Sequence, residues 1–235
     1  MKYRIFTLAV LLSCIPTLNW AQNPEQDWAQ LNKYQTENQQ LMHKAPDSSR
    51  VVFMGNSITE AWKDSDPDFF QHPSYINRGI SGQTTPQMLI RFRPDVINLK
   101  PAVVVILAGI NDIAGNTGPM TLEETFGNIQ SMVQLAKAHQ IEVVLCSVLP
   151  ANHFPWSPEI EPADQVIALN QMLQELAAQE NLVYVDYYKA MADEKKGLDS
   201  INSYDGVHPT PAGYKIMKPL IETGIQQALI KRKNT

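Results

Sequence analysis

The stretch VVFMGNSITEAW, residues 51–62, decides the fold class. Its β-branched, apolar start is typical of a short buried strand, and ITEAW is typical of the first turn of a helix. Gly55, Asn56 and Ser57 are therefore expected on the turn between a strand and a helix. In an open α/β sheet, this turn is where ligands bind and where helix N–H groups point outward. Ser57 is accordingly either a helix cap, a role that serine often fills, or a nucleophile.

The rest of the chain repeats this alternation of strand and helix. We expect strands at residues 51–54, 74–77, 103–107, 142–147 and 182–185. We expect helices at residues 85–99, 121–139, 164–180 and 211–230. Alternating strands and helices form βαβ units. The sequence therefore predicts an α/β fold, a three-layer α/β/α sandwich around a five-stranded, mainly parallel sheet.

The segment before the first strand has a different pattern. Trp28, Leu31 and Tyr34 recur at helical spacing within residues 22–45, which predicts a helix packed on the outside of the domain. With 235 residues and 44% hydrophobic content, the chain fits one globular domain better than two. We expect this domain to span residues 22–235.

The first 21 residues resemble an export signal. Lys2 and Arg4 precede an apolar core at residues 5–12, and Ala21 offers a cleavage point. The core is shorter than the about 20 residues of a membrane-spanning helix. We therefore expect a signal peptide at residues 1–21 and export to the periplasm or the cell exterior.

The cysteines bear on this localisation. LLSC could instead be a lipoprotein signal with lipid on Cys14, but Leu12 fits that pattern poorly. We expect no stable membrane anchor unless Cys14 is lipidated. If Cys14 leaves with the signal, Cys146 remains alone inside the apolar stretch IEVVLCSVL, where it is expected to act as a small buried hydrophobe.

Charge and residue spacing exclude several classes of protein. A net charge of -5 and a pI of about 5.5 argue against a nucleic-acid partner, which needs a concentrated basic face. The basic cluster at residues 231–233 is most simply a solvated tail. No His or Cys pair has zinc-finger or HExxH spacing, so we expect no metal site.

Four polar or glycine-rich turns are expected to meet at one edge of the sheet. They contain Ser57, RGISGQTT, AGINDIAG and DGVHPTPAGY, in that order. Ester cleavage by acyl transfer needs a nucleophile, a base, a group that orients the base, and donors for the developing oxyanion. We assign these roles to Ser57, to His208 and to Asp205. The oxyanion donors are the N–H groups of Ser57 and Gly82 and the side-chain amide of Asn111; Asp112 more simply holds its loop.

The blocks GNSIT, GISG, GIND and DGVHP, in this order, resemble those of the SGNH (GDSL-type) hydrolases. INRGISGQTTPQMLIRF and HPTPAGY are most similar to the branch with platelet-activating-factor acetylhydrolase Ib catalytic subunits and bacterial esterases. The resemblance implies a flavodoxin-like fold without metal or cofactor. It also implies the same roles for the same residues: Ser57, His208 and Asp205 as the triad, and Ser57, Gly82 and Asn111 as oxyanion donors. One position departs, because the family usually has Asp where this chain has Asn56. That Asp is not the triad acid, so the mechanism is unaffected while a negative charge beside the site is lost.

The other histidines have simpler explanations. His43, His72 and His139 are expected at the surface. His153 lies in the loop LPANHFPWSPEIEP, where with Phe154 and Trp156 it forms either one wall of the substrate pocket or only a packed loop.

These observations favour an exported serine esterase that removes small acyl groups, above all acetyl, from a small molecule or a glycan through an acyl-enzyme on Ser57. Two alternatives stay open. One is a lysophospholipase or thioesterase that acts on longer acyl chains and needs an apolar groove. The other is a non-catalytic module that binds a glycan or small ligand with the same fold.

Overall fold

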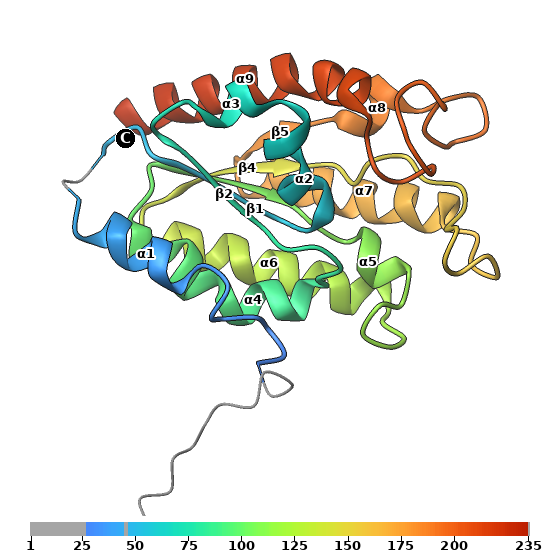
Figure 1. Cartoon of the computed structure of the whole chain (residues 1–235), viewed down its shortest axis with the longest axis horizontal. Helices are drawn as coiled ribbons and strands as arrows, with labels where there is room; N and C mark the ends of the chain where they lie inside the picture. The colour runs from blue at the N-terminus through green and yellow to red at the C-terminus, as the bar shows by residue number, and fades with distance from the viewer. Residues whose placement is uncertain (1–26, 45–46, 235) are drawn as a thin grey trace, which may run out of the picture.

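The computed structural model describes residues 27–44 and 47–234. Within these residues, five strands form one sheet in which every neighbouring pair runs parallel, in the order β2-β1-β3-β4-β5 (Figure 1). Flavodoxin-like sheets have this strand order. The strands are β1 (Val51–Gly55), β2 (Tyr75–Gly79), β3 (Val103–Leu107), β4 (Glu142–Cys146) and β5 (Val183–Val185). The predicted α/β class and five-stranded sheet are confirmed.

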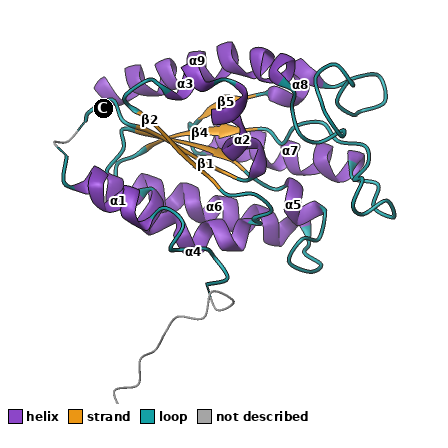
Figure 2. Cartoon of the chain, viewed as in Figure 1, coloured by secondary structure: helices purple, strands orange, loops and turns teal. Residues whose placement is uncertain are grey.

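Helices cover both faces of the sheet and form the two outer layers (Figure 2). One face carries α2 and α9, and the other carries α6 and α7, with α4 packed against α6. The short α1 lies outside, against α4. The helices are α1 (Gln35–Met42), α2 (Ser57–Ser65), α3 (Pro67–Phe70), α4 (Thr85–Asp95), α5 (Ile110–Ile113), α6 (Leu122–Ala138), α7 (Ala163–Gln179), α8 (Tyr187–Met191) and α9 (Pro211–Lys233).

The central strands end in line with one another. Gly55 at the end of β1 pairs in register with Gly79 of β2 and with Leu107 of β3. Both β1 and β3 are buried along their whole length, as expected for apolar parallel strands with helices on both faces. The turns that follow these strands therefore lie side by side at one edge of the sheet.

The prediction of an outer helix within residues 22–45 is wrong for residues 27–34. The chain turns through residues 27–34, and the helix begins only at Gln35. Asp27 accepts hydrogen bonds from the backbone N–H groups of Leu31 (2.8 Å) and Asn32 (3.0 Å), and Gln30 has a φ of 54°. The carbonyls of residues 28 and 29 accept from side chains of distant glutamines instead of from the next helical turn. We call residues 27–34 the N-terminal strap.

The two hydrophobic residues predicted to pack this helix are half exposed instead. Trp28 is 49% and Leu31 42% exposed, whereas Ala29 and Asn38 are buried. Tyr34 does pack, with its ring 4.5 Å from the Arg78 guanidinium carbon. Helical spacing identified the segment as structured but not the side chains that fasten it.

A smaller difference concerns α4, which ends at Asp95 and is followed by a 3-10 turn at Ile97–Leu99, instead of continuing to residue 99. Pro94 weakens this last turn because it has no N–H to donate to the preceding one. Cys146 is buried in β4 as expected, and burial raises the pKa of its thiol to about 12.

The predicted signal peptide at residues 1–21, with Cys14, lies outside the described residues. Within the part of the chain that the structure describes, no helix has the length and apolar character needed to cross a bilayer.

Candidate active site

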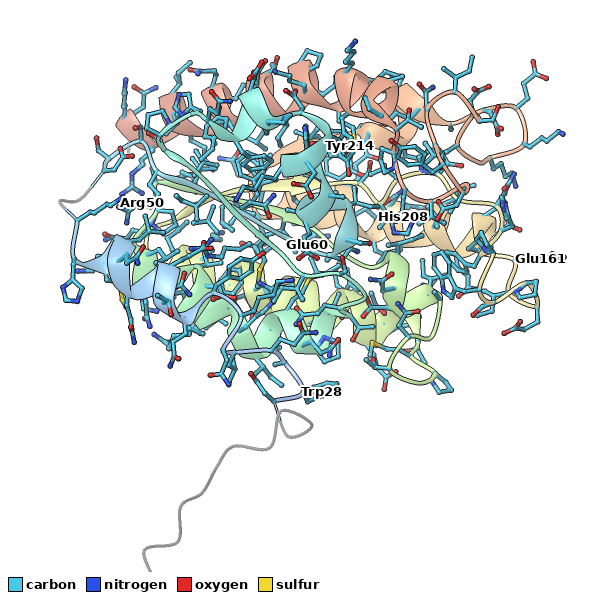
Figure 3. All side chains as sticks on the ribbon, viewed as in Figure 1. Trp28, Arg50, Glu60, Glu161, His208 and Tyr214 are labelled. Carbon is cyan, nitrogen blue, oxygen red and sulfur yellow. The ribbon has the colours of Figure 1, made fainter. Side chains whose placement is uncertain are left out.

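Ser57, His208 and Asp205 form a continuous chain of hydrogen bonds at the carboxyl edge of the sheet. Ser57 Oγ lies 2.9 Å from His208 Nε2, and His208 Nδ1 lies 2.7 Å from Asp205 Oδ2. Ser57 and His208 are 151 residues apart in sequence. The fold brings them together because Ser57 begins α2 after β1, and His208 (labelled in Figure 3) lies on the turn before α9, on the same face of the sheet.

The turn that carries Asp205 and His208 is held by its own hydrogen bonds. Asp205 Oδ1 accepts from the backbone N–H groups of Val207 (2.9 Å) and His208 (2.8 Å). Thr210 caps α9, with Pro211 in its first turn. The imidazole is thus fixed between its carboxylate and Ser57 before any substrate binds.

The same hydrogen bonds act on the charge of Asp205. Burial is the largest influence and opposes ionisation, but hydrogen bonds from the His208 backbone and side chain and from the Val207 N–H outweigh it. The net effect is a lowered pKa of Asp205. This carboxylate is therefore ionised at neutral pH and can stabilise a protonated imidazole.

Asn56, and not Ser57, caps α2. Asn56 Oδ1 accepts from the Ile58 N–H at 3.1 Å, and Ser57 is the first residue of the helix. The capping alternative for Ser57 is therefore wrong, and its hydroxyl is left to face His208. Asn and Asp are equally good caps, so Asn56 can do at this helix start what the family's usual Asp would do.

The expected oxyanion donors lie on the segments that follow β1, β2 and β3. Neither the Ser57 nor the Gly82 backbone N–H donates to a protein acceptor in the described residues. Gly82 is exposed with φ of 76°, and a Cβ there would meet nothing within 4 Å, so its backbone angle and not crowding by the protein favours glycine. Asn111 is buried, and its Nδ2 donates to the Gln83 carbonyl at 2.9 Å, which leaves its second N–H for a ligand.

Asp112 has the loop-holding position that the sequence suggested. Its Oδ1 accepts from the Thr85 N–H (2.9 Å) and hydroxyl (2.5 Å), which ties the loop after β3 to the start of α4. Its Oδ2 is buried without a hydrogen-bond partner, and burial raises the pKa of Asp112.

The loop after β4 places an aromatic ring beside the triad. Trp156 is 44% exposed, its ring centroid is 6.0 Å from that of His208, and it stacks on Phe154 at 5.3 Å. Phe154 is completely buried, so it supports Trp156 and does not line a pocket itself. His153 is exposed and packs against Gly206, where a Cβ would lie 2.4 Å from its ring. The structure thus brings Trp156 to the site, whereas His153 contacts Gly206 of the turn that holds the triad and hydrogen-bonds to Asn152 of its own loop.

His43, His72 and His139 are exposed, as expected. Within residues 27–44 and 47–234, no group of three or more His, Cys, Asp or Glu side chains is arranged to hold a metal ion.

Sequence reasoning missed the side chains that hold the oxyanion loop, residues 79–84. Glu60 of α2 accepts from the Ser81 N–H at 2.7 Å and from its hydroxyl at 2.5 Å, and it pairs with Lys33 of the N-terminal strap. Burial opposes the ionisation of Glu60, yet its hydrogen bonds with Lys33 and Ser81 lower its pKa. Gln83 is fixed by the buried Arg91. The available signal in the sequence was Arg91 and Asp95, two charged residues four positions apart on the buried face of α4.

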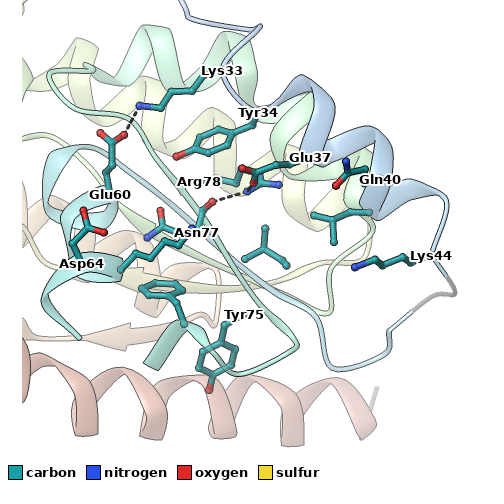
Figure 4. A pocket seen from close by; sticks show the side chains of 14 residues that line it. Lys33, Tyr34, Glu37, Gln40, Lys44, Glu60, Asp64, Tyr75, Asn77 and Arg78 are labelled. Carbon is teal, nitrogen blue, oxygen red and sulfur yellow. Dashed lines mark hydrogen bonds and ion pairs between the residues drawn. The ribbon is translucent and has the colours of Figure 1, made fainter. Parts of the chain in front are cut away.

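The Lys33–Glu60 pair also borders a hollow of about 440 Å³ along the outer edge of β2 (Figure 4). Its lining is mixed in charge, and Tyr34 and Arg78 belong to it. It does not include Ser57, Asp205 or His208. The hollow therefore lies behind the oxyanion loop and apart from the triad.

A parallel α/β sheet with hydrogen-bonded Ser, His and Asp side chains at its carboxyl edge defines a class of protein, the serine hydrolases. Comparison with known proteins gives the family. Residues 53–216 match the model of the GDSL-like Lipase/Acylhydrolase family. The chain belongs to this family and is a hydrolase of carboxylic esters, as its four sequence blocks suggested.

Three relatives illustrate the similarity. The esterase TesA of Pseudomonas aeruginosa is 30% identical over 155 residues, which are 62% of this chain and 70% of that protein. An acetylxylan esterase of Geobacillus stearothermophilus is 27% identical over 150 residues, or 60% of this chain and 67% of that protein. The crystal structure of a GDSL-like lipase from Bacteroides thetaiotaomicron superposes with a TM-score of 0.82 at 50% identity, covering 85% of this chain and 98% of that one.

Proposed function

We propose that the chain is an exported serine esterase that removes small acyl groups, above all acetyl groups carried by glycans, through an acyl-enzyme on Ser57. The observation that carries this proposal is the hydrogen-bonded chain from Ser57 through His208 to Asp205. Export rests on the charged and apolar pattern of residues 1–21.

In the first half of the reaction, Ser57 Oγ attacks the ester carbonyl carbon while its proton passes to His208 Nε2. The carbonyl oxygen becomes an oxyanion, which accepts hydrogen bonds from the N–H groups of Ser57 and Gly82 and from Asn111 Nδ2. The imidazolium, stabilised by the Asp205 carboxylate, then donates its proton to the departing alcohol oxygen. The alcohol leaves and the acyl group stays on Ser57.

In the second half, a water molecule takes the place of the alcohol. His208 Nε2 accepts the water's proton as the oxygen attacks the acyl carbon, and the same donors bind the second oxyanion. Collapse returns the proton to Ser57 Oγ and releases the carboxylic acid. The enzyme is restored without any net gain or loss of protons.

Trp156 supports a glycan as the bearer of the acyl group. Its half-exposed ring lies next to His208, the residue that protonates the departing alcohol, and it is stacked on the buried Phe154. A rigid exposed aromatic ring offers a flat apolar surface against which a sugar ring packs. Acetylxylan esterases among the relatives are in keeping with such a substrate.

The central experiment compares Ser57→Ala with Ser131→Ala, a serine on α6 whose hydroxyl donates to the Gly127 carbonyl. With p-nitrophenyl acetate, we expect Ser57→Ala to lose at least about a thousandfold in kcat with an unchanged circular dichroism spectrum. Ser131→Ala should keep its activity. Full activity of Ser57→Ala would refute the assignment of Ser57 as the nucleophile. No labelling of the wild type by an organophosphonate would instead support a binding module.

The substrate class needs a separate test. We expect acetylated xylo-oligosaccharides to be hydrolysed and p-nitrophenyl esters to be cleaved more slowly as the acyl chain lengthens. In Trp156→Ala, the ratio of kcat/KM for the oligosaccharide to that for p-nitrophenyl acetate should fall about tenfold. A preference for long acyl chains would favour a lysophospholipase or thioesterase.

A further inference from the structure

Arg91 of α4 is a buried charge that contacts the end of β1 and the segment after β2. It has no exposed surface. Burying a guanidinium is unfavourable unless its N–H groups find acceptors. Its Nη1 donates to the Arg78 carbonyl (2.8 Å) and to Asp95 Oδ2 (3.0 Å), its Nη2 to the Gly55 carbonyl (2.9 Å), and its Nε to Gln83 Oε1. All three of its nitrogens are therefore used.

Two of these acceptors belong to the segments that build the active site. Gly55 ends β1, two residues before Ser57, and Gln83 follows Gly82 directly. The Gly55 carbonyl also accepts from the Ile80 N–H at 3.1 Å, at the start of the oxyanion loop. A single rigid, planar group thus holds the turn that carries the nucleophile and the loop that carries Gly82 at a fixed separation.

Gln83 passes this constraint on to the oxyanion donors. Its Nε2 donates to the Ala29 carbonyl of the N-terminal strap at 2.8 Å, so both ends of its amide are held. Its own carbonyl accepts from Asn111 Nδ2 at 2.9 Å. Arg91, through Gln83, therefore sets the backbone next to Gly82 and the orientation of the Asn111 amide.

We propose that Arg91 is a positioning residue of the oxyanion hole, which acts through Gln83 on the donors at Gly82 and Asn111 and through the Gly55 carbonyl on the Ser57 turn. Donors in an oxyanion hole are effective because they are already in place when charge develops. A loosened Gln83 lets them drift from the oxyanion while the ester still binds. This inference rests on the roles proposed above for Ser57, Gly82 and Asn111.

The test uses two variants, Arg91→Lys and Gln83→Met. Lysine cannot reach four acceptors from one point, and methionine keeps the length of Gln83 without its amide. With p-nitrophenyl acetate, we expect kcat to fall about tenfold or more in each folded variant, while KM changes less than about threefold. The Ki of a trifluoromethyl ketone, whose adduct with Ser57 carries an oxyanion, should rise by the same factor as kcat/KM falls.

Leu176→Ala is the matched control, because Leu176 is a buried residue in the last turn of α7 and removing its side chain lowers stability without touching the loop. It should unfold at a lower temperature with kcat and Ki close to those of the wild type. If Gln83→Met is folded and retains the wild-type kcat and Ki, the donors are not positioned through Gln83 and the proposal is overturned. An equal loss of kcat in Leu176→Ala would also overturn the proposal. Failure of the proposed function itself would appear separately, as an inactive wild type or an active Ser57→Ala.

Discussion

Asn56 decides what Ser57 is free to do. A helix start leaves its first N–H groups without partners, and a side-chain oxygen at the cap satisfies one of them. Because Asn56 Oδ1 bonds to the Ile58 N–H, the next hydroxyl can face His208 instead. A single amide in the cap position therefore separates the structural role from the chemical one.

Substitution of Asn56 should show both roles. We expect Asn56→Ala to lower the free energy of unfolding by about 1 kcal/mol, because the cap is lost, and to lower kcat because the Ser57 turn relaxes. Asn56→Asp keeps an acceptor in the same place and should retain most of the activity. Urea unfolding and p-nitrophenyl acetate hydrolysis measure the two effects. An Asn56→Ala variant as stable as the wild type would contradict the capping role.

The two aspartates near the site should respond to pH in opposite directions. Hydrogen bonds in the folded state lower the pKa of Asp205, so its ionised form adds stability above its unfolded pKa, and this stability is lost as the pH falls. Burial raises the pKa of Asp112, so its ionised form is unfavourable and the protein regains stability as the pH falls.

Thermal unfolding from about pH 8 to about pH 2 tests these signs, because the stability that Asp205 contributes is lost only below the ordinary aspartate pKa of about 3.9. Asp205→Asn should be less stable than the wild type at the upper end, with a difference that shrinks on acidification. Asp112→Asn should be at least as stable as the wild type at the upper end and lose that advantage on acidification. If the stability differences of both variants followed pH in the same direction, the electrostatic explanation would be wrong for one of them.

At the scale of elements, the N-terminal strap acts as part of the active-site support. Tyr34 donates to the Gly79 carbonyl, Lys33 pairs with Glu60, and the carbonyls of residues 28 and 29 accept from Gln87 and Gln83. Each contact falls on the oxyanion loop, on the helix that follows it, or on the carboxylate that holds Ser81. The strap therefore supports the oxyanion loop through contacts that do not involve the triad.

Tyr34→Phe tests this support because it removes the hydroxyl and keeps the ring over Arg78. Burial raises the pKa of Tyr34 to about 12, so the hydroxyl is a donor at any working pH. We expect a loss of about 1 kcal/mol in the free energy of unfolding, since the Gly79 carbonyl loses a buried partner. A fall in kcat of a few fold should accompany it. Unchanged urea unfolding would show that the strap is not fastened there.

At the scale of the whole molecule, the triad depends on the packing of α9. Tyr214, in the first turn of α9, donates to the Ile58 carbonyl of α2 at 2.7 Å, which joins α9 to α2 next to the site. Farther along, a Cβ at Gly224 would lie 2.6 Å from a Val185 methyl, so glycine lets α9 approach the sheet closely. The distance from Ser57 to His208 is thus a property of the assembled core.

This dependence predicts how activity is lost in urea. Because detaching α9 both unpacks the core and separates His208 from Ser57, we expect activity and far-ultraviolet circular dichroism to disappear in one common transition. Both should be measured across the same urea series after equilibration. Loss of activity at clearly lower urea than the loss of helical signal would show that the site opens before the core.

The sequence by itself determined the layers and the strands, and it predicted the three side chains, Ser57, His208 and Asp205, that the fold joins by hydrogen bonds. Apolar runs such as VVFMG and VVVIL specify buried parallel strands through local patterning, and the polar turns that follow them must meet at one edge. The strand boundaries differ from expectation by no more than two residues, at β2. The Asp-to-His spacing was equally readable, because both side chains lie on one short turn.

Only the tertiary structure decided that Asn56 caps α2, that residues 27–34 form a strap instead of a helix, and that Arg91 reaches Gly55 and Gln83. In each case a side chain forms a hydrogen bond with a backbone or amide group. For the strap and for Arg91, the two partners lie far apart in the sequence. Helical or strand periodicity carries no information about such partners. Periodicity records which face of an element is buried. Which polar groups meet inside that buried space depends on how the elements pack.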